Sequence, residues 1–211
     1  LKEIYFEPSS FLRKFFFEFY FRKKKIKNHV IITQQKWIKN SLIKKFKLNN
    51  IIVSNPKISK SKLKRTFSKK KTFIYPSLPR FQKNHEVICK ACENLNRKEL
   101  DYEILFTFKK NECKYSKYIS KISSQIPNIK FIGRQNNLEM KKLYQKASYL
   151  IFSSKLETWG LPVSEAISYN IPVIISNLAY AKETIGAYKK VIYFNPDNYI
   201  QLSNILSKLI S

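Results

Sequence analysis

The sequence is poor in glycine, with only Gly133, Gly160 and Gly186 among its 211 residues. These glycines cannot form the G-x-G-x-x-G fingerprint of a dinucleotide-binding turn or the G-x-x-x-x-G-K-[ST] loop that cradles phosphates. Collagen-like and Gly/Ser-linker proteins are excluded for the same reason. Any phosphate binding by this chain must therefore rest on side-chain cations or on the amino end of a helix.

Aspartate and cysteine are also scarce. Asp101 and Asp197 are the only aspartates, so no D-x-D pair can hold a divalent cation against a phosphate. Cys89 and Cys92 form a C-x-x-C, but no second pair follows at the spacing of a zinc site, and we interpret them as two thiols on one helix. An odd count of three cysteines without a signal peptide indicates free thiols in a reducing compartment, so we expect a cytoplasmic location.

Acidic residues of both kinds are few, with 14 Asp and Glu against 41 Lys and Arg, which gives a formal net charge of +27. Since 44% of the residues are hydrophobic, the chain can bury a core and is not a disordered polycation. Residues 58–72 carry seven basic residues and no acidic one, which predicts a solvated linker. The positive charge has two interpretations: attraction to anionic lipid or nucleic acid, and a compositional bias toward the AT-rich codons of Lys, Ile and Asn.

An aromatic and basic segment stands near the start of the chain. Residues 11–21 contain seven aromatics, and residues 22–25 are all basic. The segment is too short and too charged to span a bilayer. It is either a helix in the interface of an anionic membrane or a helix packed within an N-terminal domain. We expect no nucleic-acid partner, because no RNA- or DNA-binding motif appears.

Short apolar runs alternate with amphipathic segments along the chain, which predicts an α/β fold with a parallel, doubly wound sheet. Such sheets bind ligands beyond the carboxyl ends of their strands. The expected strands are 4–6, 29–33, 51–53, 73–75, 103–108, 129–132, 149–152, 172–175 and 191–194. The expected helices are 11–26, 35–47, 84–95, 112–122, 138–147, 162–169 and 199–209, with a short helical turn at Glu183.

Two glutamates, Glu157 and Glu165, stand eight residues apart across a strand-to-helix loop. Pro162 suits the first position of the helix, and the backbone N–H groups of Gly160 and Leu161 can face an anion at its amino end. The Glu165 side chain leans back toward the same end, where its carboxylate can accept hydrogen bonds from vicinal hydroxyls. This arrangement suits a ligand with a phosphate and a polyol, such as a nucleotide sugar.

Further residues accompany this pair: Phe131-Ile132-Gly133, Leu143-Tyr144, Ala147, Ser154, Ala166, Ile171-Pro172-Val173-Ile174 and Glu183-Thr184-Ile185-Gly186-Ala187. With them the sequence resembles the donor-binding domain of the retaining GT-B glycosyltransferases of family 4, including its E-x7-E signature and its Glu-x-x-Gly turn. The resemblance implies a Rossmann-like nucleotide-sugar-binding domain at 72–211 and a basic linker at 57–71. Residues 1–56 would be the remnant of a second Rossmann-like domain, which carries the acceptor side in the family.

The resemblance also implies roles for matched positions. Glu157 would bind the hydroxyls of the transferred sugar and Glu165 those of the ribose, while the amides of Gly160 and Leu161 would touch the sugar or the diphosphate. Lys83, which stands with Asn84 where the family usually has Lys-Gly, would neutralise the diphosphate leaving group. Arg80 is a second candidate for that task, and Arg134 would lie near the base. The family needs no metal, and no other cofactor is implied.

The implied function is a hexosyltransferase that moves a sugar, with retention, from a nucleoside diphosphate sugar to a sugar or lipid-linked acceptor. The implied setting is surface polysaccharide or glycolipid synthesis, in the cytoplasm or peripherally on the inner face of a membrane. Two alternatives stay open: a GT-B-type nucleotide-sugar epimerase, and a non-catalytic basic module that binds membranes or nucleic acid. Because the chain begins with Leu1, we expect a fragment. Because the glutamate pair is intact while the acceptor half is cut, we expect this fragment to bind donor and to turn over poorly or not at all.

Overall fold

The computed structural model describes residues 18–19, 29–58, 65–66, 70–95 and 100–211. The expected strand at 4–6 and the expected helix at 11–26, with its aromatic and basic run, lie outside this range except for Glu18 and Phe19, which are helical. Within the range described, no helix is both long and apolar enough to cross a membrane.

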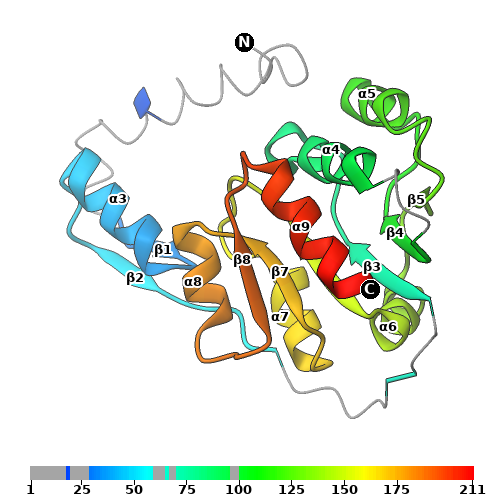
Figure 1. Cartoon of the computed structure of the whole chain (residues 1–211). Helices are drawn as coiled ribbons and strands as arrows, with labels where there is room; N and C mark the ends of the chain where they lie inside the picture. Colours follow the sequence, from blue (N-terminus) through cyan, green and yellow to red (C-terminus); the bar gives the residue numbers. More distant parts are fainter. Residues whose placement is uncertain (1–17, 20–28, 59–64, 67–69, 96–99) are drawn as a thin grey trace.

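Six parallel strands form the larger sheet (Figure 1), as the sequence predicts. In spatial order they are β5 (Ile129–Phe131), β4 (Tyr102–Phe106), β3 (Lys71–Tyr75), β6 (Tyr149–Phe152), β7 (Val173–Ser176) and β8 (Val191–Phe194). The chain winds outward from β3 in one direction and then, from β6, in the other. The loops after β3 and β6 therefore flank the crevice in which doubly wound folds bind their ligands.

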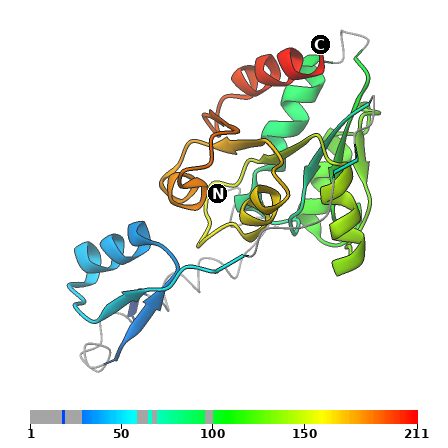
Figure 2. The same cartoon turned by 90° about the horizontal axis from the view of Figure 1, so that it is seen from below.

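Helices cover both faces of this sheet because parallel crossovers are right-handed and the direction of winding reverses between β3 and β6. Figure 2 shows α4 and α9 on one face and α6 and α7 on the other. The helices are α4 (His85–Leu95), α5 (Lys114–Ile122), α6 (Asn137–Lys146), α7 (Leu161–Ser168), α8 (Ala179–Ile185) and α9 (Tyr199–Ile210). A short 3-10 turn, η2 (Phe81–Lys83), precedes α4 and was not expected from the sequence.

The central strands are mostly apolar because helices cover both of their sides. Phe73, Ile74 and Tyr75 of β3 have no exposed surface. His85 is buried among aromatic rings at the start of α4, and its Nε2 lies 2.8 Å from the Ser77 hydroxyl. Burial, with the nearby charge of Lys83, lowers the pKa of His85 to about 3, so this side chain is a neutral core residue at pH 7.

A smaller unit precedes the large sheet. It consists of β1 (Ile31–Thr33), α3 (Lys36–Phe46) and β2 (Ile51–Val53), with β1 and β2 paired in parallel. These bounds match the predicted strand, helix and strand within two residues at each end. The unit is a βαβ motif of the kind from which Rossmann-like domains are built, and α3 lies beside α8 (Figure 1).

The basic stretch between the two units is docked in part, so the expectation of a solvated linker was wrong at Arg65 and Thr66. The Arg65 guanidinium donates hydrogen bonds to the carbonyl oxygens of Ala147 (2.6 Å) and Asn170 (3.2 Å). The Thr66 N–H donates to the Gln145 carbonyl at 3.0 Å. These carbonyls lie at or just beyond the ends of α6 and α7, where helices leave acceptors without intrahelical partners.

Candidate functional site

Lys83 and Glu157 form an ion pair that joins the loops following β3 and β6. Lys83 ends η2, which follows β3, and Glu157 lies on the loop that follows β6. The Lys83 ammonium donates to Glu157 Oε1, and the two side chains are only 18% and 13% exposed. An ammonium has three N–H donors and a carboxylate has two acceptor oxygens. This ion pair therefore leaves two N–H donors of Lys83 and the acceptor Oε2 of Glu157 available to a ligand.

The backbone around Lys83 is fixed by its neighbours. The Tyr75 hydroxyl donates to the Lys83 carbonyl at 2.6 Å, and the Ser153 hydroxyl lies 3.0 Å from the carbonyls of both Lys83 and Asn84. Asn84 has a φ of 55°, in the left-handed region that favours glycine and tolerates asparagine. This conformation explains why Asn can stand at the glycine position of a Lys-Gly pair. The Asn84 side chain also donates to the Pro196 carbonyl at 2.8 Å.

Gly160 turns the loop after β6 into helix α7. Its φ is 89°, and a Cβ atom at this position would lie 3.4 Å from the Phe152 ring. We predicted that Pro162 is the first residue of the helix. The helix begins at Leu161, so Pro162 occupies its second position. The first amides of a helix lack intrahelical partners and attract anions. Leu161, at this end, is half exposed.

Glu165 lies in the second turn of α7 and is held by a residue from α6. The Tyr144 hydroxyl donates to Glu165 Oε2 at 2.6 Å. Tyr144 is 2% exposed, and burial together with the charge of Glu165 raises the pKa of its phenol well above 10. The sequence marked Tyr144 only as part of a family pattern and assigned it no role, because a contact between two helices leaves no local signal.

The two arginines lie in different surroundings. Arg80 is exposed and precedes η2, and its carbonyl accepts the Lys83 N–H at 2.9 Å, so it shares the loop of Lys83. Arg134 is 75% exposed, and its Nε lies 3.8 Å from Glu112 Oε2, in the loop after β4. Arg134 thus pairs with a glutamate other than Glu157 or Glu165. That Arg134 lies near the base of the nucleotide stays a prediction.

Glu183 contacts the smaller unit, which the sequence did not reveal. Its carboxylate accepts the backbone N–H groups of Lys36 and Trp37, each at 2.7 Å, at the start of α3. The sequence led us to interpret Glu183 as part of a helix that ends near Gly186, and α8 does end at Ile185. The carboxylate has this second role because α3 has neither a side-chain N-cap of its own nor an acidic residue in its first turn.

A relay of hydrogen bonds links this contact to the loop between the paired glutamates. The fully buried Gln35 side chain donates to Thr184 Oγ1 at 2.8 Å and to the Tyr180 carbonyl at 3.0 Å. The Thr184 hydroxyl donates in turn to the carbonyl of Trp159. Trp159 is 8% exposed, and its indole N–H donates to the Ser164 hydroxyl at 2.8 Å. Trp159 is thus a core residue of the loop.

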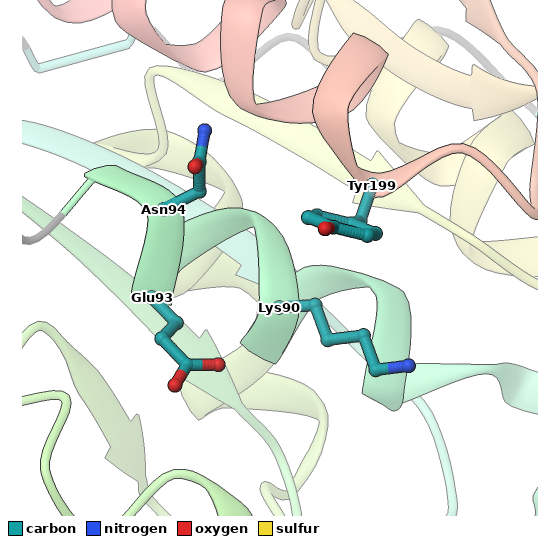
Figure 3. Close-up of a pocket in the computed structure, with 4 residues that line it drawn as sticks. All are labelled: Lys90, Glu93, Asn94 and Tyr199. Atoms are coloured by element: carbon teal, nitrogen blue, oxygen red, sulfur yellow. The ribbon is translucent and has the colours of Figure 1, made fainter.

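A separate cavity of about 340 Å³ lies between α4 and α9, lined by Lys90, Glu93, Asn94 and Tyr199 (Figure 3). None of the residues predicted for the site lines it. Cys89 and Cys92 are buried free thiols on α4, as interpreted from the sequence, and burial raises the pKa of Cys92 to about 12. Across the described ranges, no three or more His, Cys, Asp or Glu side chains gather in a group that could hold a metal ion.

Comparison with known proteins gives consistent results. At 24% identity over 204 residues, the chain is similar to the O-antigen chain mannosyltransferase RfbU of Salmonella typhimurium, covering 92% of this chain and 54% of that protein. The chain thus spans about half the length of the curated relative that it matches.

Solved structures share the fold at low identity. A glycosyltransferase from Rickettsia africae gives a TM-score of 0.72 at 16% identity, covering 91% of this chain and 56% of that one. The Anabaena protein HepE, in complex with UDP-glucose, gives 0.72 at 15% identity, covering 86% of this chain and 54% of that one. The family model "Glycosyl transferases group 1" matches residues 54–211, which is most of the sequence, and the chain therefore belongs to that family.

Proposed function

We propose that this chain carries the donor-binding half of a retaining, family 4 glycosyltransferase that uses a nucleoside diphosphate sugar. The observation that carries the proposal is the Lys83–Glu157 ion pair, which joins the loops after β3 and β6 at the point where the winding of the sheet reverses. The amino end of α7 begins in the same loop. A cation, a carboxylate and free helix amides suit a ligand that has both an anion and hydroxyl groups.

Each residue then has a defined task. In the transfer, the bond between the anomeric carbon and the diphosphate oxygen breaks. A bond to the acceptor oxygen forms on the same face of the sugar as that oxygen gives its proton to the departing diphosphate oxygen. Lys83, with Arg80 as a second cation, and the amides of Gly160 and Leu161 stabilise the charge that develops on the departing diphosphate. Oε2 of Glu157 accepts hydrogen bonds from the hydroxyls of the transferred sugar.

The nucleoside is held further from the reacting atoms. Glu165 accepts hydrogen bonds from the ribose hydroxyls, and Arg134 lies near the base. These contacts supply binding and orientation and take no part in the breaking bond. No metal or cofactor enters this scheme, because side-chain cations and helix amides carry the neutralisation of charge.

The name of one relative supports a proposal for the acceptor and the setting. RfbU is named for mannosyl transfer to an O-antigen chain, which favours a hexosyl donor and a sugar or lipid-linked acceptor in surface polysaccharide synthesis. We place the protein in the cytoplasm, at the inner face of a membrane. The net charge of +27 favours peripheral attraction to anionic lipid over a purely free location.

Isothermal titration calorimetry with UDP, GDP and ADP, and with their sugar conjugates, tests the proposal. One of the three series should bind, and Glu165→Ala should weaken its binding by at least tenfold. Glu139→Ala is the matched control, because Glu139 is an exposed glutamate of the neighbouring helix α6. Binding that is unchanged in Glu165→Ala contradicts the site.

Two further measurements separate the alternative functions. Conversion of the bound donor to an isomeric nucleotide sugar without acceptor indicates an epimerase. Salt-sensitive binding to anionic liposomes or RNA that persists after loss of both Glu157 and Glu165, with no nucleotide binding, indicates a non-catalytic basic module. Either result overturns the proposal of a glycosyltransferase.

A further inference from the structure

We infer that Tyr144 is a positioning residue that holds the Glu165 carboxylate in the orientation needed to recognise the ribose of the donor. The inference rests on the proposed function, since it assigns the ribose to Glu165. Tyr144 belongs to α6 and Glu165 to α7, so the contact joins two helices that cover the same face of the sheet (Figure 2).

The contact between the two residues has the geometry of a strong hydrogen bond. The distance from the Tyr144 hydroxyl oxygen to Glu165 Oε2 is 2.6 Å, which is the length of a charge-assisted O–H···O⁻ bond. Tyr144 is nearly fully buried, and its ring stacks on that of Tyr169 with centroids 5.3 Å apart. The ring is thereby fixed, and a tyrosine loses little rotamer freedom when it is held in this way.

The direction of the bond is fixed as well. Burial and the neighbouring carboxylate raise the pKa of the Tyr144 phenol, so at neutral pH Tyr144 donates the hydrogen bond and Glu165 accepts it. Oε2 is thus occupied by the protein. Among the residues that the structure describes, no hydrogen bond to Glu165 Oε1 is formed, and this oxygen is the one available to ligand hydroxyls.

The same division occurs at the other glutamate. Glu157 Oε1 accepts the hydrogen bond from Lys83, and Oε2 is available to a ligand. In each of the two carboxylates, one oxygen is thus bonded within the protein and the other can accept from a ligand. Loss of the Tyr144 hydroxyl would leave the Glu165 carboxylate free to rotate and would leave Oε2 without its donor. The effect should fall on recognition of the ribose hydroxyls and leave contacts to the base and diphosphate as they are.

The test compares a ribonucleotide with its 2′,3′-dideoxy form. Calorimetry first identifies which of UDP, GDP and ADP binds to the whole chain, and the dideoxy form of that nucleotide is then titrated in parallel. The Tyr144→Phe variant keeps the stacked ring and loses only the hydroxyl. We expect it to weaken ribonucleotide binding by about 5- to 10-fold, less than the loss of a whole charge-assisted bond because the Glu165 carboxylate remains, and to leave the dideoxy form almost unaffected.

A matched control is Tyr188→Phe. Its hydroxyl donates to the Ile171 carbonyl at 2.8 Å, just before β7 begins, away from the carboxyl edge of the sheet. This variant also loses one tyrosine hydroxyl with a hydrogen bond, and it should keep the full preference for the ribonucleotide. A general loss of stability would lower the affinity of both nucleotides alike and would not produce the selective change.

The outcomes separate the inference from the function on which it rests. If no nucleotide binds to the unmodified chain, the proposed function fails. If nucleotide binds but Glu165→Gln keeps the ribose preference, the assignment of Glu165 fails. If Glu165→Gln abolishes the preference while Tyr144→Phe keeps it, only the role of Tyr144 is overturned.

A double variant gives an independent test through coupling. If Tyr144 acts through Glu165, Tyr144→Phe should cause no further loss of ribonucleotide affinity in a chain that already carries Glu165→Gln. A further loss of fivefold or more in the double variant would mean that Tyr144 affects binding by another route, and would overturn the inference.

Discussion

Removing the Glu183 carboxylate should weaken the contact of α3 with α8. Two backbone N–H groups at the start of this helix, those of Lys36 and Trp37, donate to Glu183 at 2.7 Å. The residue at the N-cap position, Gln35, makes no side-chain cap, and the first turn has no acidic residue. In Glu183→Ala the amino end of α3 therefore loses its only side-chain acceptor among the residues that the structure describes.

The magnitude follows from the type of bond. Removal of an N-cap acceptor costs about 0.5–2 kcal/mol, and hydrogen bonds to charged groups lie toward the upper end. We expect a loss of about 2 kcal/mol in Glu183→Ala, which corresponds to an equilibrium constant for opening of the contact that is about 30-fold larger. Glu183→Gln keeps one acceptor oxygen and loses the charge, so a loss of about 1 kcal/mol is expected.

Hydrogen exchange measured by mass spectrometry reports this opening directly. Amides of α3 should exchange about 30-fold faster in Glu183→Ala, while those of the central strand β3 should not change. Glu139→Ala is the control, since Glu139 caps the start of α6 by accepting the Asn136 N–H at 2.7 Å within one helix. Unchanged protection of α3 in Glu183→Ala, or an equal loss in the control, would show that Glu183 does not hold the amino end of α3.

Three further predictions concern the loops and the core. Asn84→Ala should lower the free energy of unfolding in urea by about 1–2 kcal/mol, and Asn84→Gly by less, because alanine fits the left-handed conformation poorly; equal effects would contradict this. Gly160→Ala should lower the melting temperature and weaken nucleotide binding, since its φ of 89° is one that alanine rarely adopts, whereas Gly160→Asn should be milder because asparagine tolerates a positive φ better. The pKa of His85 is about 3 when folded and about 6.5 when unfolded, so between these values the unfolded chain binds the extra proton and stability falls with decreasing pH, by at most about 1.4 kcal/mol per unit. His85→Phe should remove that slope from urea unfolding curves recorded between pH 7 and pH 4.5, and an unchanged slope would contradict its neutral, buried state.

The regular elements could be predicted because their apolar spacing is local. Strands β2, β6 and β8 have the predicted bounds, since each is a short apolar run enclosed by polar residues. Elements without such spacing were missed or misplaced. The turn η2 is too short to show a period. The start of α7 was predicted one residue too late, at Pro162, because the left-handed residue before the helix is Gly160 and the helix begins directly after it, at Leu161.

Contacts between distant residues could not be predicted. Lys83 and Glu157 were both candidates, but 74 positions separate them, and only the winding order of the sheet brings them together. Glu183 reaches Lys36 across 147 positions, and Tyr144 reaches Glu165 between two helices whose packing no short window encodes. The single sequence thus names most of the candidate residues and leaves their pairing to the fold.

A crystal structure of this chain with the nucleoside diphosphate that binds in calorimetry tests the central claim most directly. We expect a diphosphate within hydrogen-bond distance of the Lys83 ammonium and the first amides of α7, with the ribose hydroxyls on Glu165. A nucleotide bound elsewhere, such as in the cavity between α4 and α9, with the Lys83–Glu157 pair untouched, would show that the proposed donor site is wrong.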